Sequence, residues 1–125
     1  MKLLIVAFFV LLITGCASAP SEEEIANAYY GKDHSQSECE RIVESVLSSS
    51  LKDPGSAQWQ HGSCYRGWSS SLTSGKKFGW ILQGSVNGKN SYGGYTGFSA
   101  YQAVIRDNRL VASCIANSDG LCMLM

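Results

Sequence analysis

The clearest pattern in the chain is an apolar stripe at helical spacing within "SQSECERIVESVLSSSLKDPG", residues 35–55. Ser37 and Glu40 match a capping box at its start, and Pro54 cannot continue a helix at its end. The pattern therefore predicts a helix over 38–52, with Glu44 among the acidic residues on its outer face. The residues of the stripe are Cys39, Ile42, Val43, Val46, Leu47 and Leu51.

Beyond residue 56 the period changes to alternation, which predicts β-strands. In the segment 76–86, even spacing places Phe78, Trp80, Leu82 and Val86 on one face. Further strands are expected over 57–69, 98–107 and 108–117, the last two joined by a tight turn at Asp107-Asn108. An apolar helix stripe and an apolar sheet face bury each other. We therefore expect one α+β domain over 37–125, in which a main N-terminal helix packs on an antiparallel sheet of about four strands.

The first residues have a different pattern. Leu3–Ile13 is an unbroken apolar run of about eleven residues behind Lys2, too short to span a bilayer as a helix and typical of a signal peptide. "LITGC" at 12–16 resembles a bacterial lipobox. The resemblance implies a signal peptide over 1–15 and lipidation of the Cys16 thiol. The alternative is an ordinary secretory signal cut near residues 17–19.

The same resemblance gives an expected location. In Gram-negative lipoproteins, Ala17 rather than Asp after the lipidated cysteine implies sorting to the outer membrane. The chain would then be held in the cell envelope, facing the periplasm. Residues 16–36 are expected to form a tether that contains a short helix over 22–30, because Ser21 and Glu24 match a capping box and Gly31 can end a helix.

The cysteines fit an oxidising compartment. With Cys16 assigned to lipid, four remain, and an even number in an exported chain predicts two disulfides, although four cysteines allow three connectivities. Helix rise and strand rise favour Cys39–Cys64, and the turn signals in "IANSDGL" favour Cys114–Cys122. The chain has no Cys-x-x-Cys pair and no histidines at ligand spacing, so we expect neither a metal site nor a cofactor.

Ten basic residues balance ten acidic residues, which argues against nucleic-acid binding. The distribution is uneven, because all six glutamates lie between Glu22 and Glu44. After residue 51 there are seven basic residues against three acidic ones. This excess is either an ordinary solvated surface or a preference for an anionic partner.

The sequence offers little catalytic chemistry. Ser74 and Lys77 form a Ser-x-x-Lys pattern without its companion motifs, and His61 has no evident nucleophile partner. We therefore expect no enzymatic activity. A cell-wall or lipid hydrolase that uses Ser74 or His61 is the remaining catalytic interpretation.

Two segments, "LKDPGSA" at 51–57 and "VNGKNSYGGYTGF" at 86–98, resemble a shared pattern of a group of small exported bacterial proteins of uncharacterised function. The resemblance covers residues 37–105. It implies a helix followed by a sheet in one domain, and it implies no activity.

The loop 87–98 is the best candidate for function. It is rich in glycine and contains Lys89, Tyr92, Tyr95 and Phe98. The rings either cap the core or, with Lys89, form a contact surface, and Tyr95 is expected to be more exposed than Tyr92. The leading interpretation is a non-catalytic envelope lipoprotein that binds a periplasmic or outer-membrane partner. The alternative is an exclusion or inhibitor lipoprotein carried by a phage or mobile element.

Overall fold

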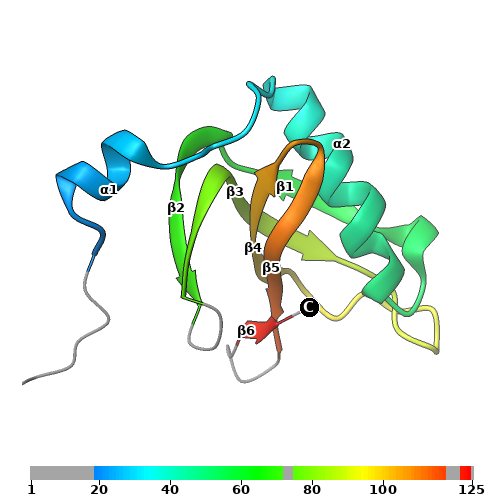
Figure 1. The fold of residues 1–125 in the computed structure, drawn as a ribbon. Helices are drawn as coiled ribbons and strands as arrows, with labels where there is room; N and C mark the ends of the chain where they lie inside the picture. Colours follow the sequence, from blue (N-terminus) through cyan, green and yellow to red (C-terminus); the bar gives the residue numbers. More distant parts are fainter. Residues whose placement is uncertain (1–18, 72–74, 118–121, 125) are drawn as a thin grey trace, which may run out of the picture.

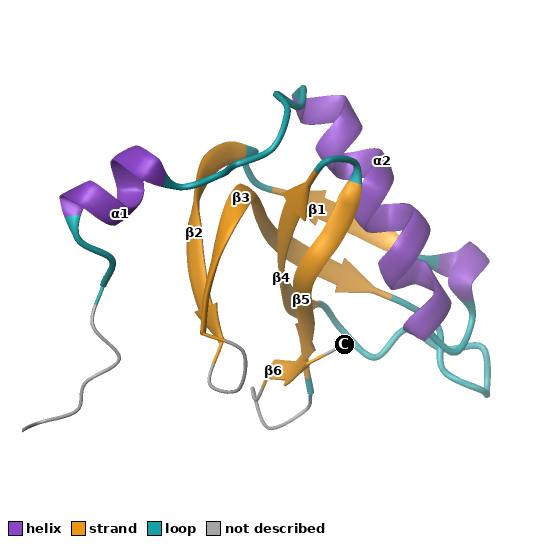
Figure 2. Cartoon of the chain, in the orientation of Figure 1, coloured by secondary structure: helices purple, strands orange, loops and turns teal. Residues whose placement is uncertain are grey.

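The computed structural model describes residues 19–71, 75–117 and 122–124. A single antiparallel sheet forms one layer and helix α2 (Gln36–Leu47) lies across its face (Figures 1 and 2). The strand order is β1-β3-β4-β5-β6, with β2 also paired to β3. The strands are β1 (Gln58–His61), β2 (Tyr65–Ser71), β3 (Gly75–Asn87), β4 (Ser99–Arg106), β5 (Arg109–Ala116) and β6 (Cys122–Leu124).

This arrangement confirms an α+β fold with one main helix on a small antiparallel sheet. Two details of the expectation are wrong. Within the described residues the sheet has six strands rather than about four, since residues 57–69 divide into β1 and β2 and a short β6 follows β5. The main helix is also not the first element, because α1 (Glu22–Asn27) precedes it.

The start of α2 lies earlier than the sequence indicates. Ser35, not Ser37, caps the helix: its side chain accepts from the backbone N–H of Glu38, and the Glu38 carboxylate accepts from the Ser35 N–H at 2.8 Å. Two serines two residues apart present the same signal, and only the first has the extended backbone that a cap requires.

The end of α2 is set by serines rather than by Pro54. The hydroxyls of Ser49 and Ser50 donate to the carbonyl oxygens of Val46 and Leu47 at 2.6 and 2.7 Å. Such local bonds compete with the helical ladder. The α-helix therefore ends at Leu47, and a single 3-10 turn, η1 (Ser48–Ser50), follows.

The core lies between α2 and the facing side of β3 and β4. The predicted stripe is largely confirmed, but Val46 is exposed and Leu51 lies beyond the helix. The buried cluster contains Cys39, Ile42, Val43, Leu47, Leu82, Tyr101, Ala103 and Ile105, with Trp59, Cys64, Trp80, Leu110 and Ile115 packed against it.

The long strand β3 organises the sheet. Its first half pairs with β2 and its second half pairs with β1, and β4 pairs along the opposite edge. The sheet also curls, since Gln102 of β4 donates to the Ser69 hydroxyl of β2 at 3.0 Å although β3 lies between these strands. The curl accounts for the burial of Ile81 and Val104, which alternate with the helix-facing residues.

The segment before α2 is fastened to the β4–β5 turn. Asp107 and Asn108 have φ values of 53° and 65°, so the predicted tight turn is confirmed. The Asp107 carboxylate accepts from the Tyr29 hydroxyl at 2.7 Å and from the Lys32 N–H at 3.0 Å, and His34 contacts Asn108 at 3.1 Å. Part of the expected tether therefore packs on the domain.

Helix α1 lies at the end of the molecule away from α2 (Figure 1), and its Glu24 pairs with Lys76 of β3 at 3.1 Å. Ser21 caps it as predicted, but it ends before Ala28 and not at Gly31. The Cys39–Cys64 disulfide joins α2 to the start of β2 and is confirmed. Cys114 is also disulfide-bonded, while the side chain of Cys122, its expected partner, lies outside the described residues.

Candidate functional site

The loop between β3 and β4 has a backbone fixed by its own side chains. The amide oxygen of Asn90 accepts from the N–H groups of Tyr92 and Gly94 at 2.9 and 3.1 Å. The Asn90 N–H in turn donates to the Gly94 carbonyl oxygen at 2.8 Å. Lys89 and Tyr95 form an isolated antiparallel bridge at the base of the loop. Residues 89–95 thus form a closed turn rather than a loose connection.

The 3-10 turn η2 (Pro54–Ser56) supports this loop. The Ser56 hydroxyl accepts from the Lys89 N–H at 2.9 Å, and the Ser56 carbonyl oxygen accepts from the Tyr95 hydroxyl at 2.8 Å. The two segments singled out in the sequence, 51–57 and 86–98, are therefore neighbours in space, at the end of the molecule away from α1 (Figure 1). Ser56 therefore binds both sides of the closed turn, at Lys89 and at Tyr95.

The three rings of the loop differ in exposure. Tyr92 is 97% exposed, Tyr95 43% and Phe98 48%, so the expectation that Tyr95 is the more exposed tyrosine is wrong. Tyr95 is partly covered because its hydroxyl reaches Ser56 and the Lys89 ammonium lies 5.5 Å from its ring centroid. Capping of the core is therefore excluded for Tyr92, which projects into solvent.

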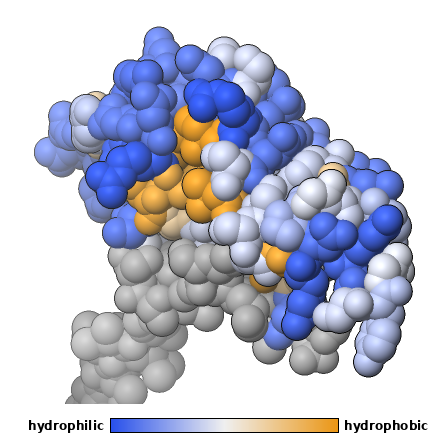
Figure 3. Space-filling view, turned by 90° about the vertical axis from the view of Figure 1, so that its right-hand side faces the viewer, coloured by the Kyte–Doolittle hydropathy of each residue, from blue (hydrophilic) through white to orange (hydrophobic). Residues whose placement is uncertain are grey.

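A shallow groove of about 210 Å³ lies between this loop and the end of η1. Its lining includes two lysines, Lys52 and Lys89, an apolar part from Leu51, Val86 and Ile115, and no acidic residue. Figure 3 turns this side of the molecule toward the viewer, and hydrophilic and intermediate colours cover most of it. The remaining lining residues are Ser50, Gly88, Asn90, Thr96, Gly97 and Ser99.

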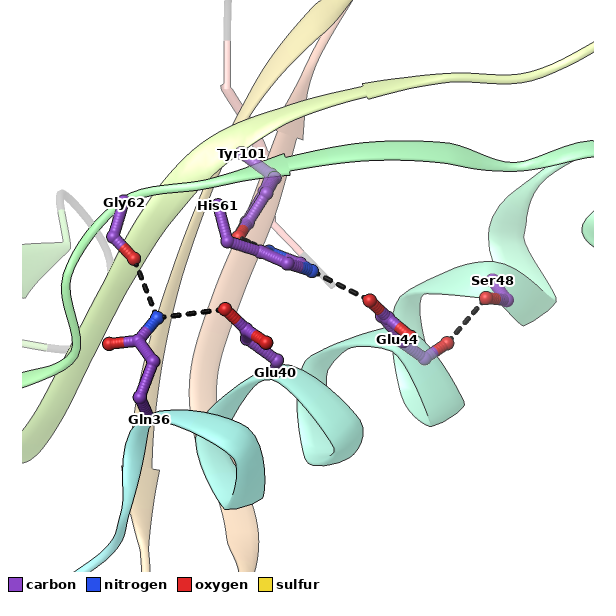
Figure 4. A network of polar contacts seen from close by, with 7 residues as sticks. All are labelled: Gln36, Glu40, Glu44, Ser48, His61, Gly62 and Tyr101. Atoms are coloured by element: carbon purple, nitrogen blue, oxygen red, sulfur yellow. Dashed lines mark hydrogen bonds and ion pairs between the residues drawn. The ribbon is translucent and has the colours of Figure 1, made fainter.

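A second polar cluster lies under α2, where His61 meets two partners (Figure 4). Its Nε2 lies 2.7 Å from the Glu44 carboxylate, and its Nδ1 contacts the Tyr101 hydroxyl. The Gln36 amide extends the cluster: it donates to Glu40 at 2.9 Å and to the Gly62 carbonyl oxygen at 2.8 Å. These contacts connect one face of α2 to β1 and β4.

Burial raises the pKa of the Tyr101 phenol strongly, and the negative charges of Glu40 and Glu44 raise it further. The phenol therefore stays protonated. His61 contacts the Tyr101 hydroxyl through Nδ1 and the Glu44 carboxylate through Nε2. Both ring nitrogens of His61 have a partner and its side chain is only 9% exposed, so the cluster joins the helix to the sheet.

Sequence reasoning missed Glu44 and Tyr101 in this cluster. The helical pattern predicts that Glu44 faces outward, but its carboxylate contacts His61 of β1. The available signal was the spacing of Glu40 and Glu44, one turn apart on a helix that precedes a strand containing His61.

The remaining candidates stay untested by the structure. Cys16 and Ser74 lie outside the described residues. Within 19–71, 75–117 and 122–124, no three His, Cys, Asp or Glu side chains are grouped to hold a metal ion. No helix in the same ranges is long and apolar enough to cross a bilayer.

Comparison with protein-family models, curated proteins and solved structures finds no match to the chain.

Proposed function

We propose that the protein is a non-catalytic, lipid-anchored protein of the bacterial cell envelope that binds a periplasmic or outer-membrane partner. The binding residues are those of the loop surface, which we define as Lys89, Tyr92, Tyr95 and Phe98. The anchor is the Cys16 thiol at the end of the "LITGC" motif. Acyl chains on one residue would give stable attachment, since each buried methylene contributes about 0.8 kcal/mol.

The observation that carries the proposal is the exposure of Tyr92 on a fixed backbone. A tyrosine ring that is 97% exposed contributes little to folding and leaves nearly its whole surface open to a partner. Because the N–H of Tyr92 is held by Asn90, the backbone that carries the ring is fixed, and less backbone entropy is lost when a partner covers the ring. Tyrosine also gives a large contact area with few rotatable bonds.

Photo-crosslinking in intact cells tests the binding proposal. A benzophenone amino acid replaces Tyr92 in one strain and Glu22, an exposed residue of α1, in a control strain. We expect a discrete adduct from position 92 and none of the same mass from position 22. No adduct at 92, or the same adduct from both positions, would overturn the proposal.

The anchor is tested separately. Cys16→Ala should abolish palmitate labelling and release the chain from the membrane fraction. Cys114→Ala serves as the control, because it also removes one cysteine and should leave labelling intact. Unchanged labelling of Cys16→Ala would contradict the anchor while leaving the loop surface to be judged by crosslinking.

A further inference from the structure

We propose that the groove beside the loop surface receives an acidic peptide segment of the partner, with an apolar side chain seated on the groove floor and carboxylates facing Lys52 and Lys89. This inference rests on the proposed function and names the chemistry of its partner. Three features of the molecule carry it: the charge of this end of the domain, the lining of the groove and the way in which the loop uses its own donors.

The charge of this end is one-sided. The sequence contains no acidic residue between Asp53 and Asp107, a stretch that includes η2, β1, β3, the loop and β4. The glutamates lie instead in α1 and α2. Asp53, next to Lys52, is the nearest acidic residue in sequence and does not line the groove. The described lining of the groove therefore carries two positive charges and no negative one, which favours an anionic group.

Lys89 is placed for this task. Its N–H is fixed by Ser56 and its ammonium by the face of Tyr95, at 5.5 Å from the ring centroid. A lysine held in this way loses less side-chain entropy on pairing than a free surface lysine does. Lys52 also lines the groove and is exposed, so two lysines and three apolar residues share one lining.

The floor favours a peptide over a sugar. Leu51, Val86 and Ile115 contribute apolar surface, and no aromatic ring lines the groove. An aliphatic side chain of a peptide fits an aliphatic floor, whereas the lining offers no aromatic face on which a sugar ring could stack. A volume of about 210 Å³ is enough for one such side chain and its backbone.

The loop is also a poor phosphate site. Phosphate is bound by converging backbone N–H groups or by arginine forks. Here the N–H groups of Tyr92 and Gly94 donate to Asn90 and that of Gly97 donates to Asn87 at 3.2 Å. Neither arginine nor a free nest of N–H groups is among the residues that line the groove. Two separated lysines suit two separated carboxylates.

The test uses the full-length lipoprotein in intact cells, with a benzophenone amino acid at Thr96, an exposed residue of the groove lining. The adduct is digested and the attached partner peptide is sequenced. We expect a peptide with at least two Asp or Glu residues close in sequence to the attachment point, because two lysines line the groove. An attached glycan, or a peptide without carboxylates, would overturn the inference.

Charge variants provide the second arm. Lys52→Gln with Lys89→Gln should reduce the adduct roughly tenfold, since each exposed ion pair contributes modestly. Lys32→Gln is the matched control, an exposed lysine at the other end of the domain, and should leave the adduct unchanged. Melting temperatures of all variants show whether they fold. An adduct that persists in the double variant refutes the acidic partner but not the loop surface, whereas absence of any adduct at Tyr92 and Thr96 refutes both.

Discussion

His61 and Tyr101 touch across an intervening strand. In the sheet, Gly84 of β3 is the register partner of His61 on one side and of Tyr101 on the other. Because glycine has no side chain, the imidazole and the phenol meet over its Cα and their hydrogen bond forms. The contact with Glu44 then adds the helix to the same cluster.

Gly84→Ala should therefore destabilise the fold strongly. An added Cβ would lie 2.1 Å from the Gln60 carbonyl oxygen and 2.8 Å from a ring carbon of Tyr101, and backbone atoms cannot move aside cheaply. We expect a loss of about 1–3 kcal/mol in the free energy of unfolding, the usual cost of overpacking. Urea unfolding measures it. Gly88→Ala is the control, since its nearest neighbour is a flexible Leu51 carbon at 3.5 Å; equal losses in both variants would contradict the explanation.

Features of the fold that depend on local sequence signals could be predicted from the sequence. The disulfide Cys39–Cys64 and the turn at Asp107-Asn108 could be predicted, because both depend on spacing within one or two neighbouring elements. The identity of the helix cap could not be predicted, because Ser35 and Ser37 have the same side chain. The backbone conformation decides between them: Ser35 is extended, whereas Ser37 already lies in the helix.

The His61 cluster could not be predicted from any local sequence pattern. His61, Gly84 and Tyr101 come from three strands, and their meeting depends on sheet order and register. The composition of the loop was enough to identify its residues as candidates, but it predicted the wrong order of exposure for Tyr92 and Tyr95. Tyr95 is the covered ring because Ser56, thirty-nine positions earlier in the chain, accepts its hydroxyl.

Low pH should weaken the contacts that hold the segment before α2, at Tyr29 and Lys32, to Asp107 in the β4–β5 turn. The Tyr29 hydroxyl, and next the Lys32 N–H, donate to the Asp107 carboxylate and hold its pKa below the ordinary aspartate value. A depressed pKa in the folded state gives stability that is present above the unfolded pKa of about 3.9 and lost as the pH falls through the lower folded value. Asp107→Asn should therefore be less stable than the wild type at pH 7, and the difference should shrink as the pH falls through the lowered folded-state pKa of Asp107.

Thermal unfolding between pH 2 and 7 checks this. Asparagine tolerates the positive φ at position 107 and keeps an acceptor oxygen, so the variant removes mainly the charge. Asp53→Asn, at an exposed aspartate before η2, is the control. A difference for Asp107→Asn that stays constant with pH would show that the carboxylate charge has no role.

The Cys39–Cys64 bridge should contribute a large share of stability. It closes a loop with a sequence separation of 25, for which the loss of unfolded-state entropy corresponds to about 3 kcal/mol. The double variant with Cys39→Ala and Cys64→Ala should lose at least this amount, because Cys39 is fully buried and alanine leaves a small void. Urea unfolding measures the loss, with Ser63→Ala as the exposed neighbouring control. A loss below 1 kcal/mol would mean that the helix–sheet interface holds without the bridge.

Tyr92 and Tyr95 offer a direct separation of folding from binding. Tyr92→Ala should change the free energy of unfolding by less than about 1 kcal/mol, because the ring is almost fully exposed. Tyr95→Phe should cost about 1 kcal/mol, since it removes the hydrogen bond to Ser56 but keeps the ring beneath Lys89. Melting curves give both values.

The adduct formed from position 96 gives the binding result for the same variants. Truncation of an anchoring aromatic ring at an interface often costs 2 kcal/mol or more, so Tyr92→Ala should reduce the adduct at least tenfold while leaving the melting temperature unchanged. Tyr95→Phe should keep the adduct, because the ring and the position of Lys89 are retained. The opposite result, an unfolded Tyr92→Ala or an undiminished adduct, would show that Tyr92 is not the anchor of the loop surface. Only a lost adduct in a variant that still folds separates binding from folding, because the Tyr92 ring is 97% exposed and its removal alone does not disturb the domain.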